Sequence, residues 1–273
     1  MTTTLTNAPG RLVAPGPDTR RGPRAVTNSL TMSWRALLRI KREPELIIDV
    51  VALPVVFLLL FTYMFGGALA GSTRTYLQSL LPGTLVMSVL LITVSAGLSL
   101  NTDRTTGALD RLRALPVWQP SLVVGGLIGD ACRYLLSSSL VIGIGAAMGY
   151  RPDGGAAGVL AGVALIIVFA FSVSWIWTML GLVLRSPQAV STLSFLVQFP
   201  LTFASNTFVD PNTMPGWLRA AVNANPVSHL VTAERGLLNG DASAAQVGWV
   251  LLAAAGLLAI FAPLTMRLYR SRT

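Results

Sequence analysis

Long stretches without charged side chains constrain this chain more than any other feature of its sequence. Between Arg151 and Arg185, for example, the only charged residue is Asp153. A helix needs about 20 mainly apolar residues to cross the hydrocarbon core of a bilayer. Charged residues make up 11% of the whole chain, whereas a soluble domain carries roughly 25%. The sequence therefore predicts an all-α protein that folds in a lipid bilayer.

The apolar stretches predict six membrane-spanning helices. Their expected ranges are residues 46–69, 80–100, 122–148, 156–184, 190–205 and 247–266. The fifth is short and contains Pro200, and proline removes a backbone hydrogen bond from a helix interior. An even number of spans places both ends of the chain on the same side of the membrane.

The positions of the basic residues predict which side that is. Fifteen of the twenty lysine and arginine residues fall in segments that share a side with the termini, and four fall in the opposite segments. Cytoplasmic segments of membrane proteins are enriched in these residues. We therefore expect a multi-pass protein of the plasma (cell inner) membrane with both termini in the cytoplasm. The net charge of +9 then suits anionic lipid headgroups, and no nucleic-acid partner is expected.

The N-terminal region differs in composition from the rest of the chain. Residues 1–28 are rich in threonine, proline, glycine and arginine and lack the apolar core of a signal peptide. We expect a disordered cytoplasmic tail over 1–28 and one transmembrane domain over 29–270. At the start of that domain, apolar residues such as Leu30, Trp34 and Leu38 recur at helical spacing beside an arginine face. This pattern predicts an interfacial helix before the first span.

Rare residue types exclude several chemistries. The single lysine, Lys41, follows Ile40, so the chain has no G-x-x-x-x-G-K-[ST] loop to bind nucleotide phosphates. With one cysteine, Cys132, and one histidine, His229, an ordinary zinc site is out of reach. We expect no catalytic residue, no metal and no cofactor bound by this chain. Any energy from ATP must come from a partner.

The segment 101–116, NTDRTTGALDRLRALP, joins the second and third expected spans on the cytoplasmic side. Leu112 and Leu115 lie on one face of a short predicted helix, with Leu109 beside them. Gly107 permits a tight turn into this helix. The leucines require an apolar partner, which is either the lipid surface or, as we favour, a groove on a soluble cytoplasmic protein.

Three acidic or basic residues fall inside expected spans. Asp130 and Arg133 are three residues apart, so each can neutralise the other where isolated charges are costly. Their pairing indicates either a structural contact, which we favour, or a proton or ion relay. Asp49 lies within about one turn of the cytoplasmic end of the first span and is expected to reach toward water.

The fifth expected span carries an aromatic stripe. Phe195, Phe199 and Phe203 are spaced at i, i+4 and i+8, and Gln198 and Asn206 add amide groups. This surface could stack on a flat amphiphilic ligand and line a substrate pathway. The same stripe is also typical of helices that face lipid or pack against a neighbour.

The long connection 206–246 predicts two helices too short to span. One is expected to begin at Met214-Pro215 behind a cap at Asn212 or Thr213. The other is expected to begin at Asn225-Pro226 and to stop at Gly240. Such helices suit a re-entrant or outer-leaflet position. His229 and Glu234 lie here without a recognisable nucleophile, and we expect His229 to act as a local hydrogen bonder.

Two longer runs carry a resemblance to a known family. LPGTLVMSVLLITVSAGLSLNTDRTTGALDRLRALPV resembles the signature of type-2 ABC transporter permeases, especially the daunorubicin/doxorubicin-resistance exporter permeases. NANPVSHLVTAERGLLNG resembles the second signature of that family. The resemblance covers about residues 29–270, which is nearly the whole chain. One departure is Trp118-Gln119, where relatives often have serine and a basic residue.

The resemblance implies a fold and a set of partners. It implies six spans and a cytoplasmic coupling helix over 105–115 that docks on a separate ABC ATP-binding subunit, which binds the ATP and Mg. It also implies a second permease chain, identical or a related paralogue, with the substrate leaving between the two. The residues assigned to coupling are Asp103, Arg104, Gly107, Leu109, Asp110, Arg111, Leu112 and Arg113.

The expected function is that of a membrane subunit without enzymatic activity. It would serve an ATP-driven exporter of a drug-like antibiotic or other amphiphile, or else of a lipid or glycan precursor. A secondary transporter driven by an ion gradient is the alternative that rests on Asp49, Asp130 and Arg133. An intramembrane enzyme using His229 or Glu234 has the least support.

Overall fold

A computed structural model describes residues 44–107, 120–209 and 211–271 of the chain. Every regular element in these ranges is a helix, as the sequence predicts. The expected N-terminal tail, the interfacial helix and most of the coupling segment lie outside the described residues.

Six long helices and three short ones make up the described chain. The long ones are α2 (Pro44–Ala70), α3 (Thr73–Thr105), α5 (Pro120–Ala147), α6 (Gly155–Val183), α7 (Pro187–Phe203) and α10 (Ala244–Ser271). The short ones are η1 (Pro211–Thr213), α8 (Gly216–Ala224) and α9 (Pro226–Asn239). Each long helix overlaps one of the six apolar stretches found in the sequence, and α7 ends at Phe203, two residues before the expected end of the fifth span.

The long helices differ in how well they suit a bilayer. Among the described residues, four helices are long and apolar enough to cross one: α3, α5 from Gly126 onward, α6 and α10. The helix α2 contains a shorter apolar stretch, Pro54–Ala68, and α7 has 17 residues. The described residues therefore contain four candidate spans and shorter apolar helices, whereas the sequence predicts six spans.

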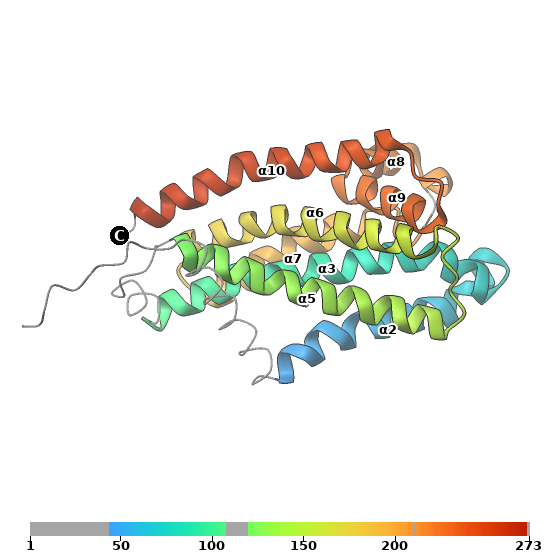
Figure 1. Ribbon diagram of the computed structural model, residues 1–273, viewed down its shortest axis with the longest axis horizontal. Helices are drawn as coiled ribbons and strands as arrows, with labels where there is room; N and C mark the ends of the chain where they lie inside the picture. The colour runs from blue at the N-terminus through green and yellow to red at the C-terminus, as the bar shows by residue number, and fades with distance from the viewer. Residues whose placement is uncertain (1–43, 108–119, 210, 272–273) are drawn as a thin grey trace, which may run out of the picture.

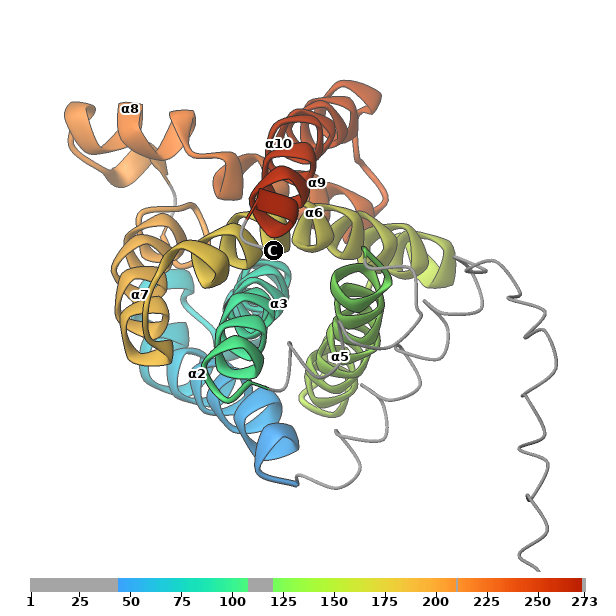
Figure 2. The ribbon, with the colours of Figure 1, turned by 90° about the vertical axis from the view of Figure 1, so that its left-hand side faces the viewer.

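The helix α3 lies at the centre of the bundle. Viewed along the bundle in Figure 2, it is surrounded by α2, α5, α6 and α7, and it packs against all four. The expected range 80–100 was too short, because α3 runs from Thr73 to Thr105. The hydroxyl of Ser72 accepts a hydrogen bond from the Thr75 amide and caps the added first turn.

The long helices place their connections alternately at the two ends of the bundle. In Figure 1, the C-terminal ends of α3, α6 and α10 lie at one end together with the starts of α5 and α7. The α5–α6 turn lies at the other end, together with α8 and α9. We call the first the joint end, after the contact between α3 and α6 that is described below, and the second the outer-helix end. The arrangement agrees with the predicted alternation, and the prediction that the joint end is cytoplasmic stays a prediction.

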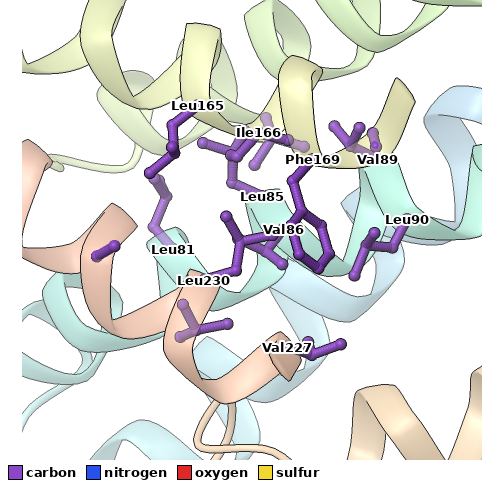
Figure 3. Close-up of a cluster of buried hydrophobic side chains, with 14 of the residues drawn as sticks. Leu81, Leu85, Val86, Val89, Leu90, Leu165, Ile166, Phe169, Val227 and Leu230 are labelled. Carbon is purple, nitrogen blue, oxygen red and sulfur yellow. The ribbon is translucent and has the colours of Figure 1, made fainter. Parts of the chain in front are cut away.

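The core is formed where α3, α6 and α9 meet. Figure 3 shows Leu81, Leu85 and Val86 of α3 facing Ile166 of α6 and Leu230 of α9. All five side chains are fully buried. The short helix α9 is therefore part of the hydrophobic core.

Glycines let α3 and α6 approach closely near the joint end. A Cβ atom on Gly97 would lie 2.1 Å from the carbonyl oxygen of Trp177, and one on Gly181 would lie 2.3 Å from the carbonyl oxygen of Gly97. The indole of Trp177 donates a hydrogen bond to the Thr93 hydroxyl at 2.8 Å. Small residues at a helix crossing are typical of membrane proteins, so α3 and α6 form a tightly matched pair.

The two outer helices are defined by their caps. The Asn225 side chain accepts a hydrogen bond from the Val227 amide at the start of α9, and Gly240 ends that helix with a φ of 82°. Both features are as predicted. The helix α8 begins at Gly216, directly after the expected Pro215. The expected cap was wrong, because Asn212 and Thr213 lie in η1 and Pro215 precedes the helix without a side-chain cap.

Candidate functional site

The last turn of α3 is bonded to the C-terminal end of α6. The buried Asn101 donates hydrogen bonds from Nδ2 to the carbonyl oxygens of Gly181 and Leu184, each at 2.8 Å. Arg104 donates to the carbonyl of Leu182 and, at 3.5 Å, to that of Leu184. The final carbonyls of a helix have no N–H donor within that helix, so side chains of α3 supply the donors that α6 lacks. We call these five residues the α3–α6 joint.

The joint lies directly before the expected coupling segment. Asp103 and Arg104 belong to the last turn of α3, where the sequence predicted a loop. Gly107 follows with a φ of 71°, the left-handed turn predicted for it. The remaining expected coupling residues, Leu109, Asp110, Arg111, Leu112 and Arg113, lie outside the described residues.

Sequence reasoning missed Asn101 as a residue that joins two helices. The signal was one amide side chain at the boundary between an apolar run and a charged loop. Its partners, Gly181 and Leu184, lie far away in the sequence, and only the fold brings them to it.

The predicted intramembrane ion pair is present. The guanidinium of Arg133 lies 3.2 Å from Oδ1 of Asp130 and also donates to the Ser95 hydroxyl at 2.7 Å. Both charged side chains are largely buried. The hydrogen bond from Arg133 to Ser95 links α5 to α3, which supports the structural interpretation of the pair. Asp49 lies on α2, and its side chain is outside the described residues.

The phenylalanine stripe of α7 is part of a larger aromatic surface. The rings of Phe199 and Phe203 stack at 4.2 Å, and that of Phe203 stacks on Phe208 at 5.2 Å. Phe208 in turn stacks on Phe61 of α2 at 4.5 Å. We call the whole set the aromatic ladder; its members are Phe195, Phe199, Phe203, Phe208, Phe57, Phe61 and Phe65.

The ladder is exposed at its α7 end. Phe195 is 61% exposed and Phe199 is 43% exposed. The two amides expected beside them lie elsewhere. Gln198 is buried, and Asn206 donates a hydrogen bond to the Thr232 hydroxyl of α9 at 2.8 Å. The open face is therefore apolar and aromatic.

No catalytic arrangement joins the polar residues of α9. His229 is exposed on this helix, whereas Glu234 is fully buried on another face. Among the described residues, no group of three histidine, cysteine, aspartate or glutamate side chains could hold a metal ion. These positions do not support a shared acid–base site.

Comparisons with known proteins show which family the sequence matches. A family model described as ABC-2 type transporter matches residues 27–238. The chain is 51% identical to the daunorubicin resistance ABC transporter permease protein DrrB1 of Streptomyces coeruleorubidus, over 91% of this chain and 88% of the relative. It is 26% identical to the probable doxorubicin resistance ABC transporter permease protein DrrC of Mycobacterium tuberculosis, over 91% and 90%.

A more distant relative is the putative transport permease ycf38 of Cyanophora paradoxa, at 23% identity over 72% of this chain and 69% of the relative. The family match includes α3, its joint to α6 and the α8–α9 pair. It extends over well more than half of the chain, and the chain therefore belongs to the ABC-2 type transporter family.

Proposed function

We propose that this chain is the permease subunit of an ATP-driven exporter that moves a drug-like antibiotic or another amphiphile. The observation that carries the proposal is the 51% identity, over nearly the whole length, to a permease named for daunorubicin resistance. The absence of a phosphate-binding loop supports a separate ATP-binding subunit. A lipid or glycan precursor is the second class of cargo.

The proposed assembly follows from the family. Two permease chains, identical or related, would pair with two ATP-binding subunits that hold ATP and Mg. Each permease would cross the membrane six times within 29–270, with residues 1–28 and the joint end in the cytoplasm. The alternation of helix ends in Figure 1 supports this topology, and the distribution of basic residues supports its orientation.

The α3–α6 joint suggests how motion would pass into the membrane. A coupling helix over 105–115 would follow the last turn of α3 directly. Because Asn101 and Arg104 hold the end of α6, a pull on that segment would move α3 and α6 together. The close glycine crossing at Gly97 and Gly181 would let the pair tilt as one unit against α5 and α7.

The aromatic ladder is the proposed contact surface for the cargo. Its open rings, Phe195 and Phe199, are large, flat and apolar. Aromatic rings favour offset stacking on other flat ring systems. This surface therefore suits a planar amphiphile better than a hydrophilic sugar chain.

Replacing both Phe195 and Phe199 with alanine is expected to raise the KM for daunorubicin about tenfold, with little change in ATPase activity. Aromatic pairs contribute about 0.5–1.5 kcal/mol each beyond their buried area, so the loss of two should be measurable. The assay is ATP-dependent uptake of daunorubicin into inside-out membrane vesicles that contain the full exporter.

The matched control is Trp249→Ala, because Trp249 is a 68% exposed aromatic residue on α10. It should leave the KM unchanged. An unchanged KM in the double phenylalanine variant would remove the aromatic ladder from the cargo pathway. Absence of daunorubicin uptake by the unaltered exporter would contradict daunorubicin as a cargo.

A further inference from the structure

Glu234 is a buried carboxylic acid for which the described chain provides no hydrogen bond. Its side chain is fully buried in α9, and neither Oε1 nor Oε2 has a partner among the described residues. An ionised carboxylate in such a place loses its hydration without compensation. In its neutral form, the same group is far less costly to bury.

The carboxyl group lies against a groove made of glycines. Gly154, Gly158 and Gly162 recur at four-residue intervals where α6 begins. A Cβ atom on Gly154 or Gly158 would lie 2.4 or 2.2 Å from the carbonyl oxygen of Leu237 in α9. One on Gly162 would lie 2.4 Å from Oε1 of Glu234. We call this surface the glycine groove.

The tight fit limits what the site can bind. The glycine groove brings the backbone of α6 against both the α9 backbone and the Glu234 carboxyl group, so a metal ion with its ligands does not fit between them. Metal binding also needs further oxygen or nitrogen donors, and the described chain offers no such cluster. A proton needs no space and no second ligand.

Among the described residues, no positive charge on the helices around Glu234 contributes to its pKa, which burial alone raises. Residues 155–183 of α6 and 244–263 of α10 contain no ionisable side chain. The α3 helix contributes Tyr76, whose hydroxyl donates to the Phe208 carbonyl. On α8, Arg219 donates to the carbonyls of Pro211 and Asn212.

The remaining ionisable groups near Glu234 lie on α9 and on the α5–α6 turn. Arg235 of α9 points its guanidinium at the carbonyls of Ser79 and Asn206, and His229 is exposed. Burial, followed by the charges of Glu234 and Asp153, raises the pKa of Tyr150 to about 12. Desolvation raises the pKa of Glu234 itself to about 8.

We propose that Glu234 is a proton-binding site, and that the bound proton holds α9 in the glycine groove of α6. When the proton leaves, the carboxylate must gain water, and α9 separates from α6 to admit it. Because α9 also packs on α3, the proton controls how firmly the outer-helix end closes on the central helix pair. This inference does not depend on the proposed export function.

The direction of the pH effect follows from linkage. The closed state binds the proton with a pKa of about 8, whereas an open, hydrated carboxyl group has a pKa of about 4.3. The contribution of the proton to closure is complete below the lower value. As the pH rises between the two pKa values, the equilibrium constant for closure falls by up to about tenfold per pH unit. Above the higher pKa it falls no further.

Hydrogen–deuterium exchange on the full chain in lipid nanodiscs tests the proposal. Protection of residues 226–239, corrected for the intrinsic pH dependence of exchange, should fall steeply in the unaltered protein between pH 5 and pH 8. Glu234→Gln should keep the protection seen at low pH and lose its pH dependence. The matched control, Asp241→Asn, removes an exposed carboxylate at the end of α9 and should behave like the unaltered protein.

Equal pH dependence in the unaltered protein and in Glu234→Gln would overturn the proposal, and so would pH-independent protection in the unaltered protein. A second measurement does not depend on the variant folding. Infrared spectroscopy of the unaltered chain should show a protonated carboxyl band that persists above pH 6.5 and disappears near pH 8. Complete loss of such bands below pH 6 would equally overturn it.

Discussion

Asn101→Ala is expected to reduce ATP-driven export at least tenfold while the ATPase partner stays bound. The amide of Asn101 serves two carbonyls at the end of α6, those of Gly181 and Leu184. Leaving a buried acceptor unsatisfied costs about 1–3 kcal/mol. In the variant the Gly181 carbonyl loses its donor and the Leu184 carbonyl keeps only the 3.5 Å bond from Arg104, so α3 and α6 should no longer move as one unit. ATP hydrolysis would then continue with little transport.

The measurement is the ratio of molecules exported to ATP hydrolysed by the reconstituted complex. Thr102→Ala is the matched control, because among the described residues the Thr102 hydroxyl donates only to the Leu98 carbonyl of its own helix. It should preserve the ratio. If Asn101→Ala also preserves the ratio, the α3–α6 joint does not transmit motion.

The larger effect is expected from replacing Leu109 and Leu112 together with aspartate. We propose that these leucines dock the coupling helix into a groove on the ATP-binding subunit. Burying two carboxylates there would be strongly unfavourable. Export should fall to background, and the ATPase should be released from the membrane while the permease still inserts.

Co-purification of the ATPase with the tagged permease measures this docking. Leu109→Met with Leu112→Met is the matched control, because methionine keeps an apolar side chain of similar volume. It should retain the partner. If the aspartate variant keeps a bound and active ATPase, the leucines face lipid headgroups, which is the alternative that the sequence left open.

Local chemistry made some elements readable from the sequence. The helix α9 begins at Asn225-Pro226 and ends at Gly240, as predicted, because capping and left-handed turns depend on the residues themselves. The i, i+3 pair of Asp130 and Arg133 is local for the same reason. The apolar stretches correctly predicted the long helices, because hydropathy reports the solvent that each stretch prefers.

Other features depended on contacts between distant segments. From hydropathy, the second span was predicted to end at residue 100. The helix instead continues to Thr105, and Asn101 and Arg104 in this added part donate hydrogen bonds to the end of α6. The stripe on α7 was readable, but its continuation through Phe61 and Phe208 was not. Glu234 drew attention as a possible acid–base group. Its burial against Gly162 became visible only in the fold.

Transport by proteoliposomes that contain the permease and its ATP-binding subunit tests the proposed function most directly. Uptake of daunorubicin should require ATP, stop when the ATPase partner carries an inactivating substitution in its own nucleotide site, and ignore an imposed proton gradient. Uptake that follows the proton gradient and proceeds without ATP would instead assign Asp130 and Arg133 to an ion-driven transporter. That result would contradict a permease that is driven by ATP hydrolysis on a partner subunit.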